Sequence, residues 1–222
     1  MKAVLFDVDG TLINCKSAGR KALRKTFLDL HKIDISEKQI EFQGKTDFGI
    51  FGQIKKEFNL KIKNYDKVMA EYVKNLEITI KQTDGEILPG IKSLLVNLSK
   101  KNNVLTGLLT GNIYDGARIK LEHFNIFDYF SFGVFGDISH DRNTLSDFAL
   151  RRLKHLYDEK ITPDNIFVVG DTVHDVVCGK FINAKTVALG TGGVSEKEFQ
   201  SYSPDYFFNN LEHYEYFSAL LS

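Results

Sequence analysis

Two aspartates lie two residues apart near the start of the chain, directly after a short apolar segment. The segment from Ala3 to Phe6 is a near-continuous apolar run, as expected for a strand that is buried on both faces of a parallel sheet. Asp7 would then lie at the carboxyl end of this strand, where open α/β sheets bind ligands. Gly10 is expected to end the strand, so that Asp9 lies on a turn.

The close spacing of the two carboxylates raises a question of charge. Like charges repel at this distance unless a cation or a shared proton lies between them. A hard divalent cation such as Mg2+ would remove the repulsion, because it binds carboxylate and carbonyl oxygens. One carboxylate could then attack a phosphorus atom. The same residues also fit a strand followed by an ordinary Asp-Gly turn, so a second acidic site is needed to decide.

A second acidic segment, IFVVGDTVHD, runs from Ile166 to Asp175. Asp171 follows another apolar strand candidate, and Asp175 comes one helical turn later. In a parallel sheet the carboxyl ends of the strands meet at one edge, which would bring these residues to Asp7 and Asp9. Together the four aspartates supply enough oxygen ligands for one Mg2+ ion.

Candidate phosphate ligands follow two further strands. Thr110, Gly111 and Asn112 offer a hydroxyl and free backbone N–H groups, which can hold phosphate oxygens. Arg142 precedes a helix and is a permanent cation that can contact phosphate through two N–H groups. The later cations of that helix are expected to be solvated: Arg151, Arg152 and Lys154.

The elements that must position these residues alternate between strands and helices after Pro89. Strands are expected at Val104–Leu109, Phe130–Phe135, Ile166–Val169, Thr186–Leu189 and Tyr206–Phe208. Helices are expected at Ile91–Leu98, Tyr114–Phe124, Thr144–Leu156, Val173–Ile182 and Leu211–Leu220. This alternation predicts an α/β fold with a doubly wound, Rossmann-like parallel sheet and right-handed crossovers.

A helical region separates the first strand from this alternating part. Helical periodicity is expected at Ala18–Leu30, Ser36–Glu41, Asp47–Phe58 and Tyr65–Leu76, with no buried strand among them. We therefore expect an inserted all-α domain at residues 14–86. Residues 1–13 and 87–222 are expected to form the α/β core.

The composition limits the classes of partner. The 222 residues carry 29 Lys plus Arg and 29 Asp plus Glu, so no overall charge favours nucleic acid or an anionic membrane. No apolar run is long enough to span a bilayer, and no secretion signal precedes the first strand, so a cytoplasmic protein is expected. Cys15 and Cys178 lack metal-ligand spacing and are interpreted as reduced thiols. The oligomeric state is left open.

The motifs together resemble those of the haloacid dehalogenase superfamily of phosphohydrolases, in particular its phosphoglycolate-phosphatase-like members with a helical cap. Asp7-Val8-Asp9-Gly10-Thr11 matches the first family motif, Thr110 the second, and Gly170-Asp171-Thr172 with Asp175 the fourth. The third motif departs from many relatives, which have a lysine before a proline where this chain has Arg142-Asn143. The order, spacing and strand-end placement of the motifs make the resemblance specific.

The resemblance implies separate roles for the four aspartates. Asp7 would be the nucleophile that forms an aspartyl-phosphate, and Asp9 would be the acid and base that serves the leaving alcohol and then water. Mg2+ would be bound by the Asp7 carboxylate, the Asp9 main-chain carbonyl and Asp171. Asp175 would support the water shell of the metal.

The remaining site residues are also assigned through the resemblance. Thr110 and Arg142 would hold the phosphoryl group. The segment FQGKTD at residues 42–47 resembles the cap loop that faces the active site in relatives. Lys45 would then contact the non-phosphate end of a substrate, although it fits equally well as a solvated lysine.

The second carboxylate of the first motif favours a phosphate ester as substrate. An alkoxide leaving group needs an acid, whereas the dehalogenating and phosphonate-cleaving branches of the superfamily generally lack a carboxylate at the position of Asp9. We therefore expect a Mg2+-dependent phosphatase for a small phosphorylated metabolite. A phosphomutase of the same superfamily and a non-catalytic binding protein on the same scaffold are the alternatives.

Overall fold

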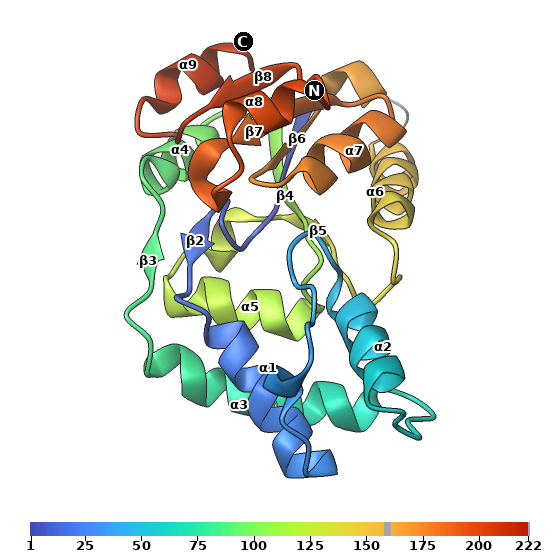
Figure 1. Cartoon of the computed structure of the whole chain (residues 1–222). Coiled ribbons are helices and arrows are strands. Elements are labelled where there is room, and N and C mark those ends of the chain that lie inside the picture. Colours follow the sequence, from blue (N-terminus) through green and yellow to red (C-terminus); the bar gives the residue numbers. More distant parts are fainter. Residues whose placement is uncertain (158–160, 222) are drawn as a thin grey trace.

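The computed structural model describes residues 1–157 and 161–221, and within them one sheet of six parallel strands carries the candidate site (Figure 1). The strands lie in the order β5-β4-β1-β6-β7-β8. Their bounds are β1 Lys2–Phe6, β4 Val104–Leu109, β5 Phe132–Val134, β6 Ile166–Gly170, β7 Lys185–Leu189 and β8 Tyr206–Phe208. The predicted doubly wound α/β fold is confirmed.

The register of the sheet aligns the ends of the motif-bearing strands. Phe6, the last residue of β1, is opposite Leu108 of β4 and Val169 of β6. The Asp7 N–H donates a hydrogen bond to the carbonyl of Val169 at 3.0 Å, which continues the pairing by one residue. Asp7 therefore leaves the sheet at its centre, beside the residues that follow β4 and β6.

Helices cover both faces of the sheet. Val4 and Phe6 belong to a large apolar cluster that includes α4 (Ile91–Leu98) and the closing helix α9 (Tyr214–Ala219). Ala3 and Leu5 belong to a second cluster with α6 (Arg142–Leu156) and α7 (Val173–Phe181). Successive β1 side chains thus face opposite layers, as the two-residue period of a strand requires. The last helix begins three residues later than predicted, and α8 (Glu196–Gln200) was not predicted.

Three helices form a lobe at the end of the molecule opposite the two chain termini (Figure 1). These are α1 (Ala18–His31), α2 (Asp47–Glu57) and α3 (Asp66–Lys81), and α5 (Tyr114–His123) lies between them and the sheet. The predicted helix at Ser36–Glu41 is wrong, because only the single 3-10 turn Ile35–Glu37 forms. The Asp34 side chain accepts a hydrogen bond from the Ser36 N–H, which stabilises this short turn instead of a longer helix.

A two-stranded antiparallel sheet joins the two ends of this lobe. Strand β2 (Ile13–Asn14) pairs with β3 (Glu86–Ile87), and neither two-residue strand was predicted. Two-residue strands carry no periodicity that a sequence could reveal. The division into 1–13 with 87–222 and 14–86 stays a prediction, and 158–160 and 222 lie outside the described residues. Within the described residues, no helix has the length and apolar character needed to cross a membrane.

Candidate active site

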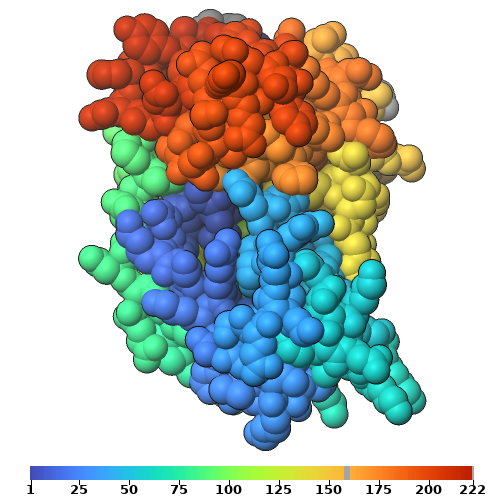
Figure 2. Space-filling view, in the orientation of Figure 1, coloured from blue at the N-terminus to red at the C-terminus, as the bar shows by residue number. Residues whose placement is uncertain are grey.

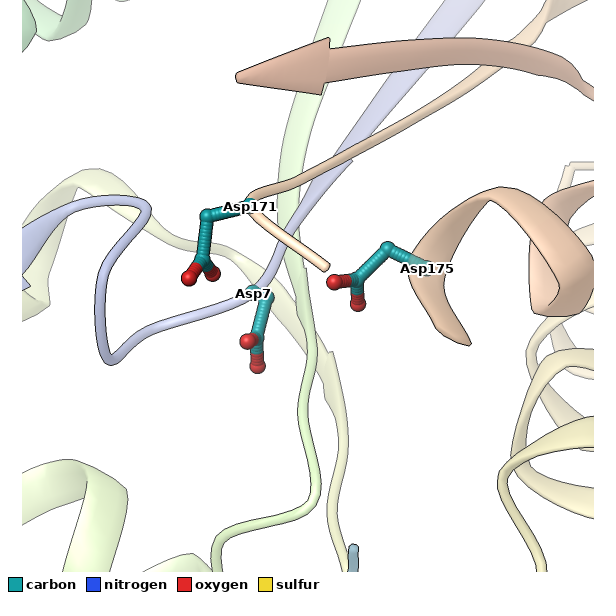
Figure 3. Close-up of side chains that lie close together, drawn as sticks. All are labelled: Asp7, Asp171 and Asp175. Carbon is teal, nitrogen blue, oxygen red and sulfur yellow. The ribbon is translucent and has the colours of Figure 1, made fainter. Parts of the chain in front are cut away.

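Three carboxylates converge at the carboxyl edge of the sheet (Figure 3). Oxygen atoms of Asp7, Asp171 and Asp175 lie within 4.8 Å of one another, and all three residues are buried. Asp171 follows β6 and accepts a hydrogen bond from the Thr11 hydroxyl at 2.9 Å. Asp175 lies in the first turn of α7 and accepts from the N–H of Thr172 at 3.1 Å and from its hydroxyl at 2.7 Å. The helix cap therefore fixes one member of the cluster.

The first loop approaches Asp171 closely, and this approach requires glycine. Gly10 has φ +82°, and a Cβ atom there would lie 2.3 Å from Asp171 Oδ2. A Cβ on Gly192 would lie 1.9 Å from the same oxygen. Two glycines thus enclose the Asp171 carboxylate at distances that no side chain would permit.

The electrostatics of this cluster favour a bound cation. Burial raises the pKa of Asp7 to about 6, and the main opposing effect is the positive charge of Arg142. Burial also raises the pKa of Asp171, and the charges of Asp7 and Asp175 add to this effect. Three desolvated carboxylates with hard oxygen donors fit a divalent cation such as Mg2+.

Arg142 lies beside these carboxylates. It occupies the first turn of α6, where the Asp141 side chain caps the helix by accepting from the N–H groups of Asn143 and Thr144. The Arg142 guanidinium forms an ion pair with Asp175 and lies 3.5 Å from Asp7. Arg151, later in the same helix, is 77% exposed and pairs with Asp147 instead. Among the cations considered in that helix, Arg142 is therefore the one that reaches Asp7.

Asp9 lies in different surroundings from Asp7. Its Oδ2 atom accepts from Asn112 Nδ2 at 2.9 Å and from Lys120 Nζ at 2.5 Å. The Asp9 side chain is 44% exposed, whereas that of Asp7 is 9% exposed. Among the described residues, the acidic cluster does not include the Asp9 carboxylate. Metal binding through the Asp9 main-chain carbonyl stays a prediction.

The segment after β4 connects the two parts of the site. Thr110 is fully buried, and its hydroxyl accepts from the N–H of Asn112 at 3.2 Å and from its Nδ2 at 2.9 Å. The Asn112 N–H is therefore not free, in contrast to the prediction. The Gly111 carbonyl accepts from the Asp47 N–H at 2.7 Å, so this loop also contacts the start of α2. Phosphate binding by Thr110, Gly111 and Asn112 stays a prediction.

Both parts of the site open into one cavity of about 470 Å³. Figure 2 shows the surface hollowed where the blue N-terminal segment, the light-blue segment and the orange C-terminal segment meet. Polar and charged residues of its wall include Asp7, Asp9, Arg20, Lys45, Asn112, Lys120, Arg142 and Asp171.

Comparison with known proteins identifies the family. A family model described as haloacid dehalogenase-like hydrolase matches residues 4–189. The chain belongs to this family. The resemblance drawn from the motifs to a haloacid dehalogenase-like phosphohydrolase is thereby confirmed.

Similar proteins within this family include two bacterial enzymes and one solved structure. A phosphoglycolate phosphatase of Aquifex aeolicus is 28% identical over 211 residues, which cover 93% of this chain and 91% of the relative. Pyrophosphatase PpaX of Oceanobacillus iheyensis is 22% identical over 217 residues, which cover 96% of this chain and 94% of the relative. The crystal structure of a β-phosphoglucomutase from Clostridium difficile matches with a TM-score of 0.74 at 20% identity. The match covers 99% of this chain and 96% of the mutase chain. The structural likeness shows a shared fold.

Lys120 contacts Asp9 in the site of this haloacid dehalogenase-like hydrolase, but it lies outside the motifs and was not predicted. It lies on α5, is only 4% exposed, and donates to Asn112 Oδ1 at 2.6 Å as well as to Asp9. The buried face of α5 includes Gly116, Ala117, Ile119 and Leu121. A lysine on this face, between buried neighbours, was the signal in the sequence that could have identified it.

Lys45 lies on the loop that contacts the core. It lines the cavity, its side chain is 43% exposed, and it pairs with Glu41 at 3.3 Å. A Cβ atom on Gly44 would lie 1.9 Å from His174 Cδ2, so this loop passes close to the fourth motif. Both interpretations of Lys45, as a substrate contact and as a solvated lysine, therefore remain predictions.

The start of α2 is tied to the second motif. The partly buried Asp47 carboxylate accepts from the Ile113 N–H at 2.9 Å. Desolvation raises the pKa of Asp47 to about 6, and the charge of Lys120 is the main opposing effect. The helical lobe thus places a further carboxyl group near Asp9.

Both cysteines are free thiols, as predicted, and both are buried. Burial raises the pKa of Cys15 to about 12 and that of Cys178 to about 11. Neither thiol is therefore a reactive nucleophile at neutral pH.

Proposed function

We propose that this protein is a Mg2+-dependent phosphatase that hydrolyses a small phosphorylated metabolite through an aspartyl-phosphate on Asp7. One observation carries the proposal: two carboxyl groups on one loop lie in different surroundings. Asp7 is buried in a carboxylate cluster next to Arg142, whereas Asp9 is half-exposed and bonded to Lys120 and Asn112. Such a difference suits one group to nucleophilic attack and the other to proton transfer.

The metal would be held by the carboxylates of Asp7 and Asp171 and by the Asp9 main-chain carbonyl, with Asp175 of the same cluster supporting its water shell. Its chemical contribution would be to offset the negative charge of the phosphoryl group as the nucleophile approaches. Arg142 would add a fixed positive charge at the same place, because its guanidinium already lies 3.5 Å from Asp7.

In the first step an Asp7 oxygen forms a bond to phosphorus while the ester P–O bond breaks. Asp9 donates its proton to the departing oxygen, so that the product leaves as a neutral alcohol. Thr110, fully buried beside Asp7, and Arg142 hold the oxygens of the phosphoryl group. The result is a phosphate covalently bound to Asp7 and an ionised Asp9.

In the second step Asp9 removes a proton from a water molecule. The resulting hydroxide attacks phosphorus, and the bond between phosphorus and the Asp7 oxygen breaks. Inorganic phosphate leaves, Asp7 is again a carboxylate, and Asp9 is again protonated. The cycle is therefore balanced in atoms, charge and protons.

The cavity supports a small and anionic substrate. Its volume of about 470 Å³ suits a metabolite, and Arg20 and Lys45 line its wall together with Arg142. The named relatives are a phosphoglycolate phosphatase and a pyrophosphatase, which support the same chemical class. We further propose that residues 14–86 form the cap domain, which excludes bulk water from the site.

The test is release of inorganic phosphate by the purified protein. A panel of phosphorylated metabolites, including phosphoglycolate and pyrophosphate, is assayed with Mg2+ and with a chelator. We expect turnover of at least one compound that disappears with the chelator and returns when Mg2+ is added.

Two other outcomes separate the alternatives. Phosphate transfer that requires a bisphosphate activator, with little release of inorganic phosphate, would identify a phosphomutase. Binding of a phosphorylated compound with no turnover under any condition would identify a non-catalytic binding protein and would contradict the proposal.

A further inference from the structure

A buried lysine lies behind the carboxylate that is proposed to transfer protons. We infer that Lys120 is a positioning residue, whose ammonium group holds the Asp9 carboxylate in the orientation that proton transfer requires. This inference rests on the proposed phosphatase function. It assigns a role to a residue of α5 that lies outside the four motifs.

Lys120, Asp9 of the first motif and Asn112 of the second motif are all hydrogen-bonded to one another. Lys120 Nζ donates to Asp9 Oδ2 at 2.5 Å and to Asn112 Oδ1 at 2.6 Å. Asn112 Nδ2 donates to the same Asp9 oxygen at 2.9 Å. Both donors bond to Oδ2, so Oδ1 is the oxygen left to exchange a proton with the substrate or with water. Two fixed donors on one oxygen also restrict rotation of the Asp9 carboxylate.

The asparagine is itself held in place. Its Nδ2 atom also donates to the buried Thr110 hydroxyl at 2.9 Å. The orientation of Asp9 is thus connected, through Asn112, to the residue that is proposed to hold the phosphoryl group. A displacement of Asp9 relative to the phosphorus atom would require these bonds to break together.

The surroundings of Lys120 restrict its movement. A Cβ atom placed on Gly19 of α1 would lie 3.5 Å from Lys120 Nζ and 3.3 Å from the Tyr72 hydroxyl of α3. The ammonium group is therefore enclosed by helices of the lobe on one side and by Asp9 on the other. A buried ammonium is costly unless it is paired and hydrogen-bonded, and here Asp9 and Asn112 meet that need.

The burial and bonding of Lys120 favour a positioning role over direct contact with substrate. Its side chain is 5% exposed, and two donors of its ammonium group are bonded to protein oxygens, on Asp9 and Asn112.

The test is a double-mutant cycle on Lys120 and Asp9. Lys120→Met, Asp9→Asn and the double variant are assayed with an aryl phosphate, whose good leaving group keeps the slow variants measurable. We expect Lys120→Met to lower kcat roughly tenfold to a hundredfold, because acid–base catalysis of this kind contributes about 10²–10⁴. KM should change less than about twofold, since ground-state binding is unaffected. In the Asp9→Asn background, Lys120→Met should have no further effect on kcat.

Arg118→Met is the matched control. Arg118 lies on the same helix, has a 32% exposed side chain, and pairs with Asp115 and Glu122 on the surface. Its substitution should leave kcat and KM unchanged. Lys120→Gln, which keeps a polar side chain but removes the ammonium group, is a second variant that should also lower kcat, and thermal unfolding shows whether each variant is folded.

Three results would overturn the inference. One is unchanged kcat in folded Lys120→Met or Lys120→Gln, and another is a raised KM with unchanged kcat, which would make Lys120 a substrate contact. The third is an equal loss of kcat with and without Asp9, which would show that Lys120 acts independently. If the wild-type protein releases no phosphate in the presence of Mg2+, the proposed function itself fails, which is a separate result.

Discussion

The two aspartates of the first loop belong to two halves of the site that differ in how the negative charge of the carboxylate is balanced. The Asp7 half consists of Asp7, Asp171, Asp175 and Arg142 and is rich in buried carboxylates. The Asp9 half consists of Asp9, Asn112 and Lys120. In it, the Asp9 Oδ2 atom accepts from both Asn112 and Lys120, and Lys120 also donates to Asn112. The Asp7 half has three acids for one arginine, whereas the Asp9 half has one acid for one lysine.

This difference shows how two carboxyl groups two residues apart obtain different chemistry. In the Asp7 half, burial raises the pKa of Asp7 to about 6, and a bound cation would favour the ionised, nucleophilic form of this carboxyl group. In the Asp9 half the positive charge is built into α5. The environment, rather than the residue type, therefore assigns the proposed roles.

The largest expected effect follows from substitution of Asp7. Asp7→Asn keeps the size of the side chain but removes the nucleophile, so we expect kcat to fall by more than about 10⁴-fold. Folding should be preserved or slightly improved, because the substitution removes a buried charge from a cluster of like charges. Steady-state kinetics and thermal unfolding measure the two effects. Normal turnover of Asp7→Asn would remove the proposed distinction between the two halves.

A smaller effect is expected at Arg142, the fixed cation of the Asp7 half. Arg142→Ala removes the guanidinium next to Asp7 and Asp175, so we expect kcat/KM to fall by about 10²-fold, as for loss of one charged transition-state contact. Inorganic phosphate should also become a weaker competitive inhibitor. Arg151→Ala, on the exposed side of the same helix, is the control and should leave both quantities unchanged. Full activity of Arg142→Ala would show that the third motif has been assigned to the wrong residue.

The smallest expected effect concerns stability near the Asp9 half. Burial raises the pKa of Asp47 from 3.8 to about 6, so between these values the folded protein holds a proton that the unfolded chain has released. The stability that Asp47 contributes is present at low pH and is lost as the pH rises through this range. Asn at this position cannot ionise but can still accept the bond from the Ile113 N–H. Relative to wild type, Asp47→Asn should therefore gain stability between about pH 4 and about pH 7, by about 3 kcal/mol at most.

Urea unfolding at several pH values measures this difference. Asp66→Asn, an exposed aspartate in the first turn of α3, is the control for loss of a helix-terminal charge. A constant difference between Asp47→Asn and wild type across this pH range would show that Asp47 is as free to ionise as a surface carboxylate. Asp47, next to the Asp9 half, would then be less desolvated than the structure indicates.

The main strands and the places where they end could be predicted because they depend on local sequence. The apolar runs before Asp7, Thr110 and Asp171 are buried strands, and each of these residues directly follows one. The position of Asp175, one helical turn after Asp171, could also be anticipated. The closing helix and the 3-10 turn at Ile35–Glu37 were less predictable, because short helices depend on contacts with the rest of the fold.

The partners of each carboxylate could not be predicted in the same way. Arg142 and Asp175 are 33 residues apart, and Lys120 and Asp9 are 111 residues apart. The apolar neighbours of Lys120 on α5 are a local sign that this lysine is covered. No local pattern records that Asp9 would be its partner.

The sequence by itself determined the α/β fold, the family and the aspartates at the carboxyl edge of the sheet, because the strands and their ends are encoded by residues adjacent in the chain. The tertiary structure decided which carboxyl group stands among like charges and which is paired with a lysine. The physical reason is that desolvation and ion pairing depend on distances between elements, and those distances exist only after the lobe packs against the core.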